Sequence, residues 1–468
     1  MFPSLRIGAK SIRAEGQFAE AQAAFLAPDP AEVARIDALL KRTNTGVVAH
    51  FYMDAELQGV LASLRHPHVH IADSLQMAER GVAMAKADAR ALVVLGVDFM
   101  SESARATLDA AGFDHVPVYR ADARSIGCSL AAAAETPGYA AYLERAARTP
   151  HSIHVIYVNT SLRTKAEAEA RLPTITCTSS NVVRTVLEAA ATIPDVHVWF
   201  GPDTYMGENL AALLRTLTEL GDDAVRAVHP AHTAASVRAF LPRFHHYDQG
   251  TCVVHHMFGA DVAKRVAHEY GDALLTAHLE VPGEMFRLAL NAQREGRGVV
   301  GSTSNILEFI GAKTAERVTD KRAGPLRIVL GTESGMVTSI VRRVQRELRG
   351  SDAEVEIVFP VAAEAVTTTA DPRLPVVPGP ASGEGCSTEG GCATCPYMKM
   401  NSLDALTHVL TLLERGDDAA LVPFLATRPA ERIGGVPLAD LATLPIVRMR
   451  AFGADQAFPR EFIEAAGR

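Results

Sequence analysis

The sequence lacks the features that mark membrane, secreted and nucleic-acid-binding chains. No apolar run approaches the roughly 20 residues that span a bilayer, and the N-terminal stretch MFPSLRIGAKSIRAEGQ has no apolar core of signal-peptide length. Lysine and arginine form no block, and the formal net charge is −8, which argues against nucleic acid and anionic membranes as partners. We therefore expect a globular protein located in the cytoplasm, with no nucleic-acid or membrane partner.

Cysteine is also scarce, since six cysteines in 468 residues are too few for a disulfide scaffold. In a reducing compartment, cysteines serve metal binding, catalysis or the core. Cys177 lies in the apolar run PTITCTSS and is predicted to be a small buried residue. The others lie in glycine-flanked or glycine-rich stretches that are typical of loops, where a thiolate can reach a metal: Cys128, Cys252, Cys386, Cys392 and Cys395.

What the chain does contain is an α/β pattern that recurs three times. Short apolar runs alternate with alanine-rich helical patterns, which predicts parallel sheets covered by helices. In each copy, a first strand ends in aromatic or polar groups, a second ends in small hydroxyl residues, and a third is followed by Gly, an acid and Met. The three elements lie at 46–52, 70–75 and 95–100, at 155–161, 176–181 and 200–206, and at 274–280, 300–305 and 330–336. Because order and spacing agree, we prefer an internal repeat over chance similarity.

The repeat has a consequence for function. Ligands bind beyond the carboxyl ends of parallel strands, so three copies that face one another would bring three polar edges to one cavity. Each copy is followed by a glycine-flanked cysteine, Cys128, Cys252 or Cys395. Three converging thiolates suit either Zn²⁺ or an iron–sulfur cluster with one open iron, which can act as a Lewis acid. The alternative is that each cysteine is an isolated loop thiol.

Other polar residues recur at equivalent positions of the copies. His50 and His278 share a strand end, which favours contact with a ligand over two unrelated structural histidines. Small hydroxyl and acid clusters at 73–74, 178–181 and 302–305 are expected to cap helices, and capped helix N-termini can also bind anions. For three further acids at one repeat position, we favour backbone capping or pairing between domains: Asp98, Asp203 and Glu333.

Taken together, these residues resemble the quinolinate synthase family from about residue 30 into the C-terminal tail. The matching stretches are VVAHFY, IADSLQMA, LGVDFMSESA, IGCSLA, IYVNTSLRTKA, TSSN, GPDTYMG, QGTCVVHHMF, HLE, GSTSNI, GTESGM and CPYMKMN. The resemblance implies an α/β fold of three three-layer αβα domains, with short parallel sheets, related by a pseudo-threefold axis around a central active site.

On this basis we predict the domain boundaries. We expect an N-terminal extension over 1–34 and three α/β repeat units over 35–140, 141–255 and 256–400. A C-terminal helical segment over 401–468 is expected to pack on the repeat unit 35–140. The third unit would end in the cysteine-rich loop.

The resemblance also implies an activity. The family condenses iminoaspartate with dihydroxyacetone phosphate to quinolinate in de novo NAD biosynthesis, which makes it a transferase. It uses a [4Fe-4S] cluster that, by motif, falls on Cys128, Cys252 and Cys395. Cys392 would be an extra cysteine for a redox switch, and Cys386 has no clear counterpart. An L-aspartate oxidase or dehydrogenase would supply the iminoaspartate.

Substrate residues carry over in the same way. Glu280 and Tyr52 are the candidates for proton transfer, because the reaction needs enolisation and two dehydrations. Leu279 replaces the family's Pro, and the stretch 221–249 is longer than typical. His229 precedes a Pro as in the family's H-P-E motif, but it lacks the Glu, so we prefer His278. The predicted substrate-binding residues are His50, Ser74, Tyr157, Asn159, Ser179, His278, Glu280, Ser302 and Thr303.

Two alternatives stay open at this point. One is an iron–sulfur or zinc carrier or sensor, which would need the cysteines but not Tyr157, His278, Glu280 or Thr303. The other is a metal-dependent lyase or aldolase that acts on a phosphorylated ketone with Zn²⁺ in place of the cluster.

Overall fold

The structure, a computed structural model, describes the chain except for residues 54, 321–323, 361–394, 396 and 468. The predictions for Cys386 and Cys392 therefore lie outside the described residues. The chain forms two compact units, each built from several segments. The first comprises Met1–Gly96, Val116–Ile126 and Val253–Leu425, and the second comprises Val97–His115, Gly127–Cys252 and Ala426–Arg468. The linear domain boundaries given above stay a prediction.

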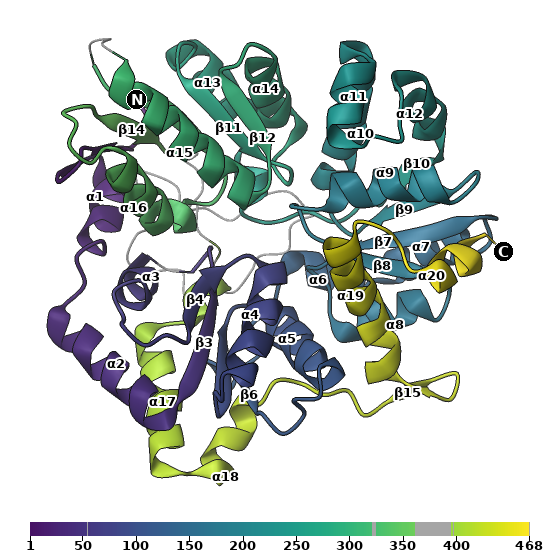
Figure 1. Cartoon of the computed structure of the whole chain (residues 1–468), viewed down its shortest axis with the longest axis horizontal. Coiled ribbons are helices and arrows are strands. Elements are labelled where there is room, and N and C mark those ends of the chain that lie inside the picture. Colours follow the sequence, from purple (N-terminus) through teal and green to yellow (C-terminus); the bar gives the residue numbers. More distant parts are fainter. Residues whose placement is uncertain (54, 321–323, 361–394, 396, 468) are drawn as a thin grey trace. The chain divides into compact units, whose positions relative to one another are not determined.

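Three sheets of the described chain share one strand order (Figure 1). In the first unit, one sheet runs β4 (Val69–Ala72), β3 (Thr45–His50), β5 (Ala91–Leu95), β6 (Val118–Arg120). Its other sheet runs β12 (Gly298–Gly301), β11 (Leu274–His278), β13 (Leu326–Gly331), β14 (Val355–Val358), β1 (Ser4–Ile7), β2 (Ile12–Glu15). The sheet of the second unit runs β8 (Thr174–Cys177), β7 (Ser152–Tyr157), β9 (His197–Gly201), β10 (Phe244–His246). Each repeat thus places its strands in the order second, first, third, fourth, which confirms the α/β class.

The register repeats as well. His50 lies opposite Ala72, Tyr157 opposite Cys177 and His278 opposite Gly301, so the first and second strands of each copy end level with one another. The strand pairs within each repeat are parallel, whereas β1 and β2, which extend the sheet of the third repeat beyond β14, pair antiparallel. In each sheet, the second strand lies on one side of the first strand and the third strand lies on the other. This order creates a topological switch point, which is where parallel sheets bind ligands.

Helices cover both faces of the sheets. In the first unit, α13 and α14 lie on one side of the β11–β12 edge, and α15 and α16 lie on the other (Figure 1). This is the layering that right-handed crossovers produce. The helices of this unit are α1 (Gln17–Ala24), α2 (Pro30–Thr43), α3 (Ala55–Leu61), α4 (Ser74–Lys86), η2 (His255–Met257), α13 (Ala260–Glu269), α14 (Gly283–Arg294), α15 (Thr303–Thr319), η3 (Ser334–Met336), α16 (Val337–Glu347), η4 (Met398–Met400), α17 (Leu403–Arg415), α18 (Asp418–Leu421) and η5 (Val422–Phe424).

The second unit follows the same plan with added helices. Its helices are α5 (Asp98–Ala110), α6 (Ser129–Ala134), α7 (Pro137–Ala147), α8 (Leu162–Glu169), α9 (Val182–Thr192), α10 (Thr204–Leu220), α11 (Asp222–Val228), α12 (Ala234–Phe240), η1 (Leu241–Arg243), α19 (Leu438–Asp455) and α20 (Arg460–Ala466), with a hairpin of β15 (Arg432–Ile433) and β16 (Val436–Pro437). The stretch 221–249, which looks long in the sequence, forms α11, α12 and the fourth strand β10. Part of it therefore belongs to the repeat itself.

Local sequence explains where these helices begin. Asp29 accepts a hydrogen bond from the backbone N–H of Ala31 ahead of Pro30, and α2 ends at Asn44 in the left-handed region. Two of the three clusters cap helices as expected, because Asp73 opens α4 and Ser302 forms a capping box with Asn305 on α15. In the cluster at 178–181, Asn181 precedes α9 but its side chain makes no capping hydrogen bond. Asp203, one of the three further acids, caps α10. Among the described residues, no helix combines the length and the hydropathy that a membrane crossing requires.

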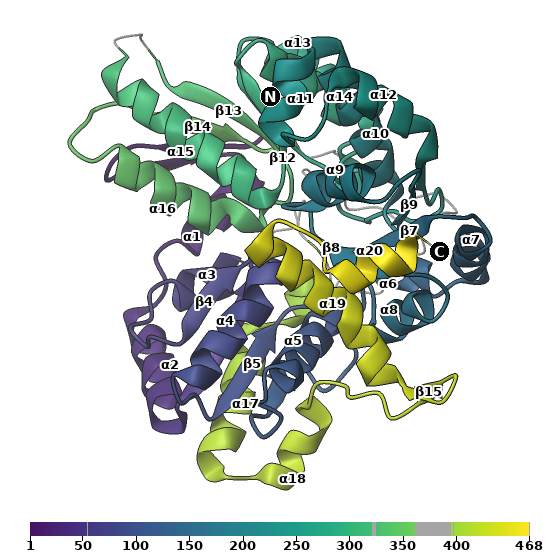
Figure 2. The ribbon, with the colours of Figure 1, turned by 45° about the vertical axis from the view of Figure 1, so that its right-hand side comes forward.

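The C-terminal residues divide between the two units. In the first, α17 packs against α2 (Figure 1). In the second, α19 packs along α8 and strand β8 (Figure 2), where Ala442 and Ile446 meet Leu162 and Ala166 in a buried apolar cluster. An ion pair between Arg448 and Glu169 lies beside this contact.

This packing predicts a difference between two adjacent residues of α19. Ile446 is 3% exposed and Val447 is 40% exposed. Ile446→Ala should lower the free energy of unfolding by about 2–4 kcal/mol, because a buried cavity remains, whereas Val447→Ala should change it by less than about 0.5 kcal/mol. Urea titration followed by fluorescence of the single tryptophan, Trp199 in the second unit, measures both. Equal losses for the two variants would contradict the packing.

Candidate functional site

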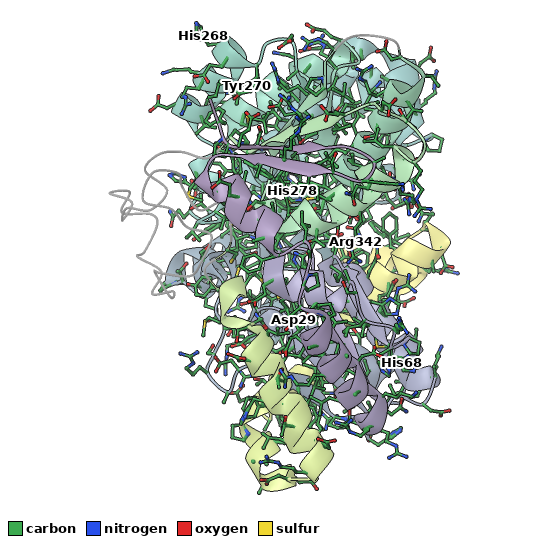
Figure 3. All side chains as sticks on the ribbon, turned by 90° about the vertical axis from the view of Figure 1, so that its left-hand side faces the viewer. Asp29, His68, His268, Tyr270, His278 and Arg342 are labelled. Atoms are coloured by element: carbon green, nitrogen blue, oxygen red, sulfur yellow. The ribbon has the colours of Figure 1, made fainter. Side chains whose placement is uncertain are left out.

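Polar side chains of the first unit gather where its parallel strands end. They end or follow β3 (His50 and Tyr52), β11 (His278 and Glu280), β12 (Ser302 and Thr303) and β13 (Thr332 and Glu333), and all of them are buried. Figure 3 shows His278 in the interior, whereas His268 lies at the periphery. Six of the predicted site residues are thus brought to one edge of this unit, as expected for the carboxyl ends of parallel strands.

The two repeat-related histidines make the same backbone hydrogen bond. The Tyr52 N–H donates to His50 Nδ1 at 3.2 Å, and the Glu280 N–H donates to His278 Nδ1 at 3.3 Å. A neutral imidazole that accepts at Nδ1 carries its proton on Nε2. Burial lowers the pKa of both rings to about 4. At neutral pH each histidine therefore presents an N–H donor with no positive charge.

Tyr52 joins the two sheets of the first unit. Its hydroxyl lies 2.9 Å from Thr303 Oγ1 and 3.3 Å from Thr332 Oγ1. Burial raises its pKa well above the ordinary value, and the negative charges of Glu280 and Glu333 raise it further. The phenol consequently keeps its proton at neutral pH and sits between the end of β3 and the starts of the elements that follow β12 and β13.

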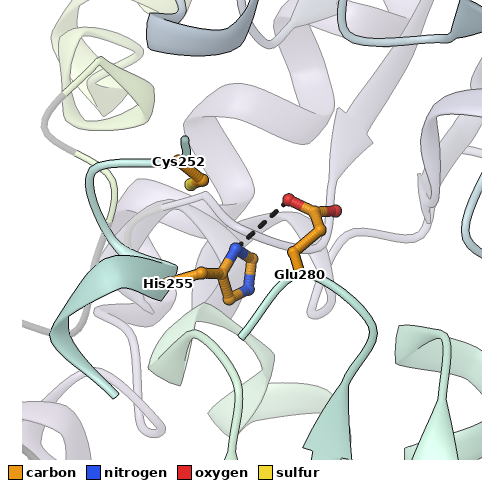
Figure 4. A group of neighbouring side chains, drawn as sticks. All are labelled: Cys252, His255 and Glu280. Carbon is orange, nitrogen blue, oxygen red and sulfur yellow. Dashed lines mark ion pairs between the residues drawn. The ribbon is translucent and has the colours of Figure 1, made fainter. Parts of the chain in front are cut away.

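Glu280 lies beside two stacked imidazoles. Its Oε2 is 3.2 Å from His255 Nδ1 (Figure 4), and its Oε1 is 3.5 Å from His278 Nδ1. The two rings are 5.1 Å apart and nearly parallel. The His255–Glu280 pair is close but poorly aligned, and neither ring nitrogen of His255 makes a hydrogen bond within the part of the chain that the structure describes. A buried polar group left in this state is costly, and it is typical of a place where a ligand binds.

Sequence reasoning missed two members of this group. His255 lies in η2 within the QGTCVVHHMF stretch but has no counterpart in the other repeats. Glu333 was expected to cap a backbone or to pair between domains; its side chain caps no helix and accepts the backbone N–H of Cys395. Burial, and then the charge of Glu280, raise the pKa of Glu333 well above its ordinary value. Its presence in the GTESGM stretch was the one available signal.

The predicted cysteine ligands are half-buried and lie in both units. In the first, the Glu333 contact holds Cys395 at the site. In the second, Ser129 Oγ donates to the Thr251 carbonyl at 3.1 Å, which ties together the residues next to Cys128 and Cys252. Only Val253 and Val254 separate Cys252 from His255, so the chain itself keeps that thiol within 4.8 Å of the imidazole (Figure 4).

The remaining predicted residues have varied surroundings. Tyr157 is buried at the end of β7, while Asn159 and Ser179 are half-buried in the loops after β7 and β8 of the second unit. Ser74 is the half-buried first residue of α4 in the first unit. The hydroxyl of Ser302 is engaged in the capping box of α15.

Two departures from the family pattern can also be located. The backbone N–H of Leu279 donates to the Gly301 carbonyl at 3.1 Å, a bond that the family's Pro could not make. Glu280 is buried in the site nevertheless. His229, which precedes a Pro, bonds to Glu188 of the second unit at 2.9 Å.

Comparison with known proteins finds a matching family and several similar relatives. The family model described as quinolinate synthetase A protein matches residues 34–423. The chain is 50% identical to proteins named quinolinate synthase, chloroplastic, from Nicotiana tabacum and Arabidopsis thaliana, over 99% of its own length and 66% of theirs. It is 49% identical to the protein of that name from Oryza sativa subsp. japonica, over 99% of its length and 68% of the relative's. The chain thus spans about two thirds of the length of these plant relatives.

The match over residues 34–423 contains the ends of β3, β11, β12 and β13, the three candidate cysteine ligands, and both His255 and Glu333. The chain therefore belongs to the quinolinate synthetase A family.

Proposed function

We propose that this chain is a quinolinate synthase, a transferase of NAD biosynthesis that condenses iminoaspartate with dihydroxyacetone phosphate. The supporting observation is the buried group of neutral donors and carboxyl groups at the strand ends of the first unit, on residues that lie in the family's motifs. An L-aspartate oxidase or dehydrogenase would supply the iminoaspartate. The matched relatives are named chloroplastic, and a cytoplasmic location for this chain stays a prediction.

The two histidines suit a substrate that carries several negative charges. His50 and His278 each offer an Nε2–H from a buried, uncharged ring. In a site with little water, such fixed donors bind carboxylates strongly and need no reorganisation when charge develops. They also add no second base that would compete with Glu280 for protons. The half-buried Asn159 and Ser179, and Tyr157, are the candidates in the second unit for the rest of the substrate.

Glu280 and Tyr52 are the proton-transfer pair in this proposal. Forming quinolinate from the two substrates releases phosphate and two waters, so a group must take protons from carbon and another must give them to leaving oxygens. Glu280, held beside His255, is the base. Tyr52 keeps its proton and is held by Thr303 and Thr332, so it is the acid.

The family resemblance implies a [4Fe-4S] cluster, and the residues present fit one. Cys128, Cys252 and Cys395 supply three half-buried thiols, the number that leaves one iron open. When bound, the cluster would act as a Lewis acid toward a substrate hydroxyl or carboxylate. The Ser129–Thr251 and Glu333–Cys395 contacts would hold the three loops in place.

One observation favours the lyase alternative. Cys252 and His255, with Glu280 next to His255, offer the mixed sulfur, nitrogen and oxygen donors that zinc accepts. A zinc-dependent lyase acting on a phosphorylated ketone would use this donor set and would need neither Cys128 nor Cys395.

Metal analysis of cysteine variants separates these possibilities. Protein purified without oxygen should contain about four iron and four acid-labile sulfide per chain, and Cys128→Ala, Cys252→Ala and Cys395→Ala should each lose them. Cys177→Ala is the matched control and should keep them, because Cys177 is fully buried in β8. Zinc in place of iron, with loss only in Cys252→Ala, would favour the lyase.

A substitution at Glu280 tests the assignment of the base. Glu280→Gln should lower kcat for quinolinate formation by about 10²–10⁴-fold, because the amide cannot accept a proton from carbon, while the iron content stays unchanged. Glu284→Gln is the control, since that exposed acid pairs only loosely with Arg287 at 3.9 Å. Full turnover in Glu280→Gln would show that another group is the base, and an iron–sulfur carrier would show no turnover in any of these proteins.

The buried neutral histidines predict how stability depends on pH. Their folded-state pKa of about 4 lies below the ordinary 6.5, so the unfolded chain takes up protons first as pH falls. Stability should therefore be lost between pH 6.5 and 4. His278→Gln should make this loss smaller, on the order of 2–3 kcal/mol less over that range, whereas His268→Gln at the exposed position should not. Urea titrations at pH 7, 5.5 and 4.5 measure the slopes, and identical slopes in all three proteins would contradict the neutral state of His278.

A further inference from the structure

Lys165 is a lysine buried inside the second unit. It lies on α8 and is fully buried. Its ammonium donates to the Val158 carbonyl at 3.1 Å, to Thr160 Oγ1 at 3.0 Å and to the Thr160 carbonyl. All three acceptors belong to the loop that follows β7, so the side chain reaches back from the helix to the end of the strand that precedes it.

The residues directly before and after Asn159 are also bonded to the sheet. The Thr160 hydroxyl donates to the Tyr157 carbonyl at 3.0 Å, and the Val158 N–H donates to the Cys177 carbonyl at 2.8 Å. Val158 and Thr160 are buried, whereas Asn159 between them is half-exposed. The backbone on either side of Asn159 is therefore fixed to the sheet and to Lys165, and its side chain remains in reach of a ligand.

An acid on another helix supports the same segment. Glu102 of α5 accepts the backbone N–H of Leu162 at 2.9 Å, at the start of α8, and its charge acts favourably on Lys165. The Lys165 ammonium also lies 5.9 Å from the centre of the Phe99 ring on α5. Thus α5 braces the loop and the beginning of the helix that carries the lysine.

Burying a charged lysine in this position costs free energy of folding. Burial lowers its pKa to about 7, which means that the fold opposes the charge. Only the ammonium has three N–H donors for the three oxygens, because a neutral amine has two and turns a lone pair toward a carbonyl. Leucine or methionine would fill the space without this cost, so the contacts to the loop are the property that needs a lysine.

We propose that Lys165 is a positioning residue for substrate, which fixes the backbone on both sides of Asn159 so that the Asn159 amide is held ready to bind a polar group of the ligand. This inference rests on the proposed function, because Asn159 is a substrate residue by its match to the family motif. Lys165 itself does not touch the substrate. It acts through Val158 and Thr160.

A double-mutant cycle on ligand binding tests this. Quinolinate, the product, is titrated calorimetrically into the cluster-loaded protein under nitrogen. Lys165→Met and Asn159→Ala should each raise Kd by about tenfold, the size of one lost polar contact. The double variant should also be about tenfold weaker, because Lys165 works through Asn159. A merely structural lysine would give either no change in Kd or independent losses that multiply to about a hundredfold, and both results would overturn the proposal.

Two further variants serve as a control and as a replacement if Lys165→Met does not fold. Lys264→Met removes an exposed lysine of the first unit, which pairs with Asp261 on the surface, and should leave Kd unchanged. If Lys165→Met does not fold, Thr160→Val replaces it in the cycle, since it removes one of the three acceptors, and about a threefold increase in Kd is expected. Wild-type protein that neither binds nor forms quinolinate would refute the proposed function. Wild-type binding that Lys165→Met and Thr160→Val leave unchanged would refute this inference alone.

Discussion

Removal from water is the constraint on which the site of the first unit depends. The ends of β3, β11, β12 and β13 carry polar side chains into the interior, and there the charged form of each group is disfavoured. The pKa values of His50 and His278 are lowered, so these rings are neutral at neutral pH, and the pKa values of Tyr52 and Glu333 are raised. The same physics that destabilises the fold at this edge therefore prepares a set of neutral donors around Glu280. Such a set is suited to anionic substrates and to proton transfer.

The repeat supplies the scaffold, and each copy uses it differently. All three sheets have one strand order and end their first two strands level with one another. At the end of the first strand, the first and third copies carry His50 and His278, and the second copy carries Tyr157. At the acid position, Asp203 caps α10, whereas Glu333 makes no helix cap and binds the backbone N–H of Cys395. Both acids are buried, so what differs is the partner: Asp203 binds the N-terminal backbone of its own helix, whereas Glu333 binds the backbone of Cys395.

Much of this was accessible from the sequence, and the rest was not for physical reasons. Strand ends and helix caps are encoded locally, so the alternation of apolar runs and capping residues located His50 and His278 at strand ends and Glu280 just beyond one. His255 was not found, and Glu333 was noticed but given a capping or pairing role, because the surroundings of both residues come from tertiary contacts with Glu280 and with the Cys395 backbone. The composition of the two compact units was equally hidden, since α5 lies with the second unit although β5 and β6 on either side of it lie with the first.

The central claim is that the chain makes quinolinate at this site. The most direct measurement is anaerobic incubation of the cluster-loaded protein with dihydroxyacetone phosphate labelled with carbon-13 at all its carbons, together with oxaloacetate and ammonium as a source of iminoaspartate. Mass spectrometry should detect quinolinate that carries three labelled carbons, in amounts exceeding the enzyme. A protein that holds its cluster and yet forms no labelled quinolinate would contradict the claim.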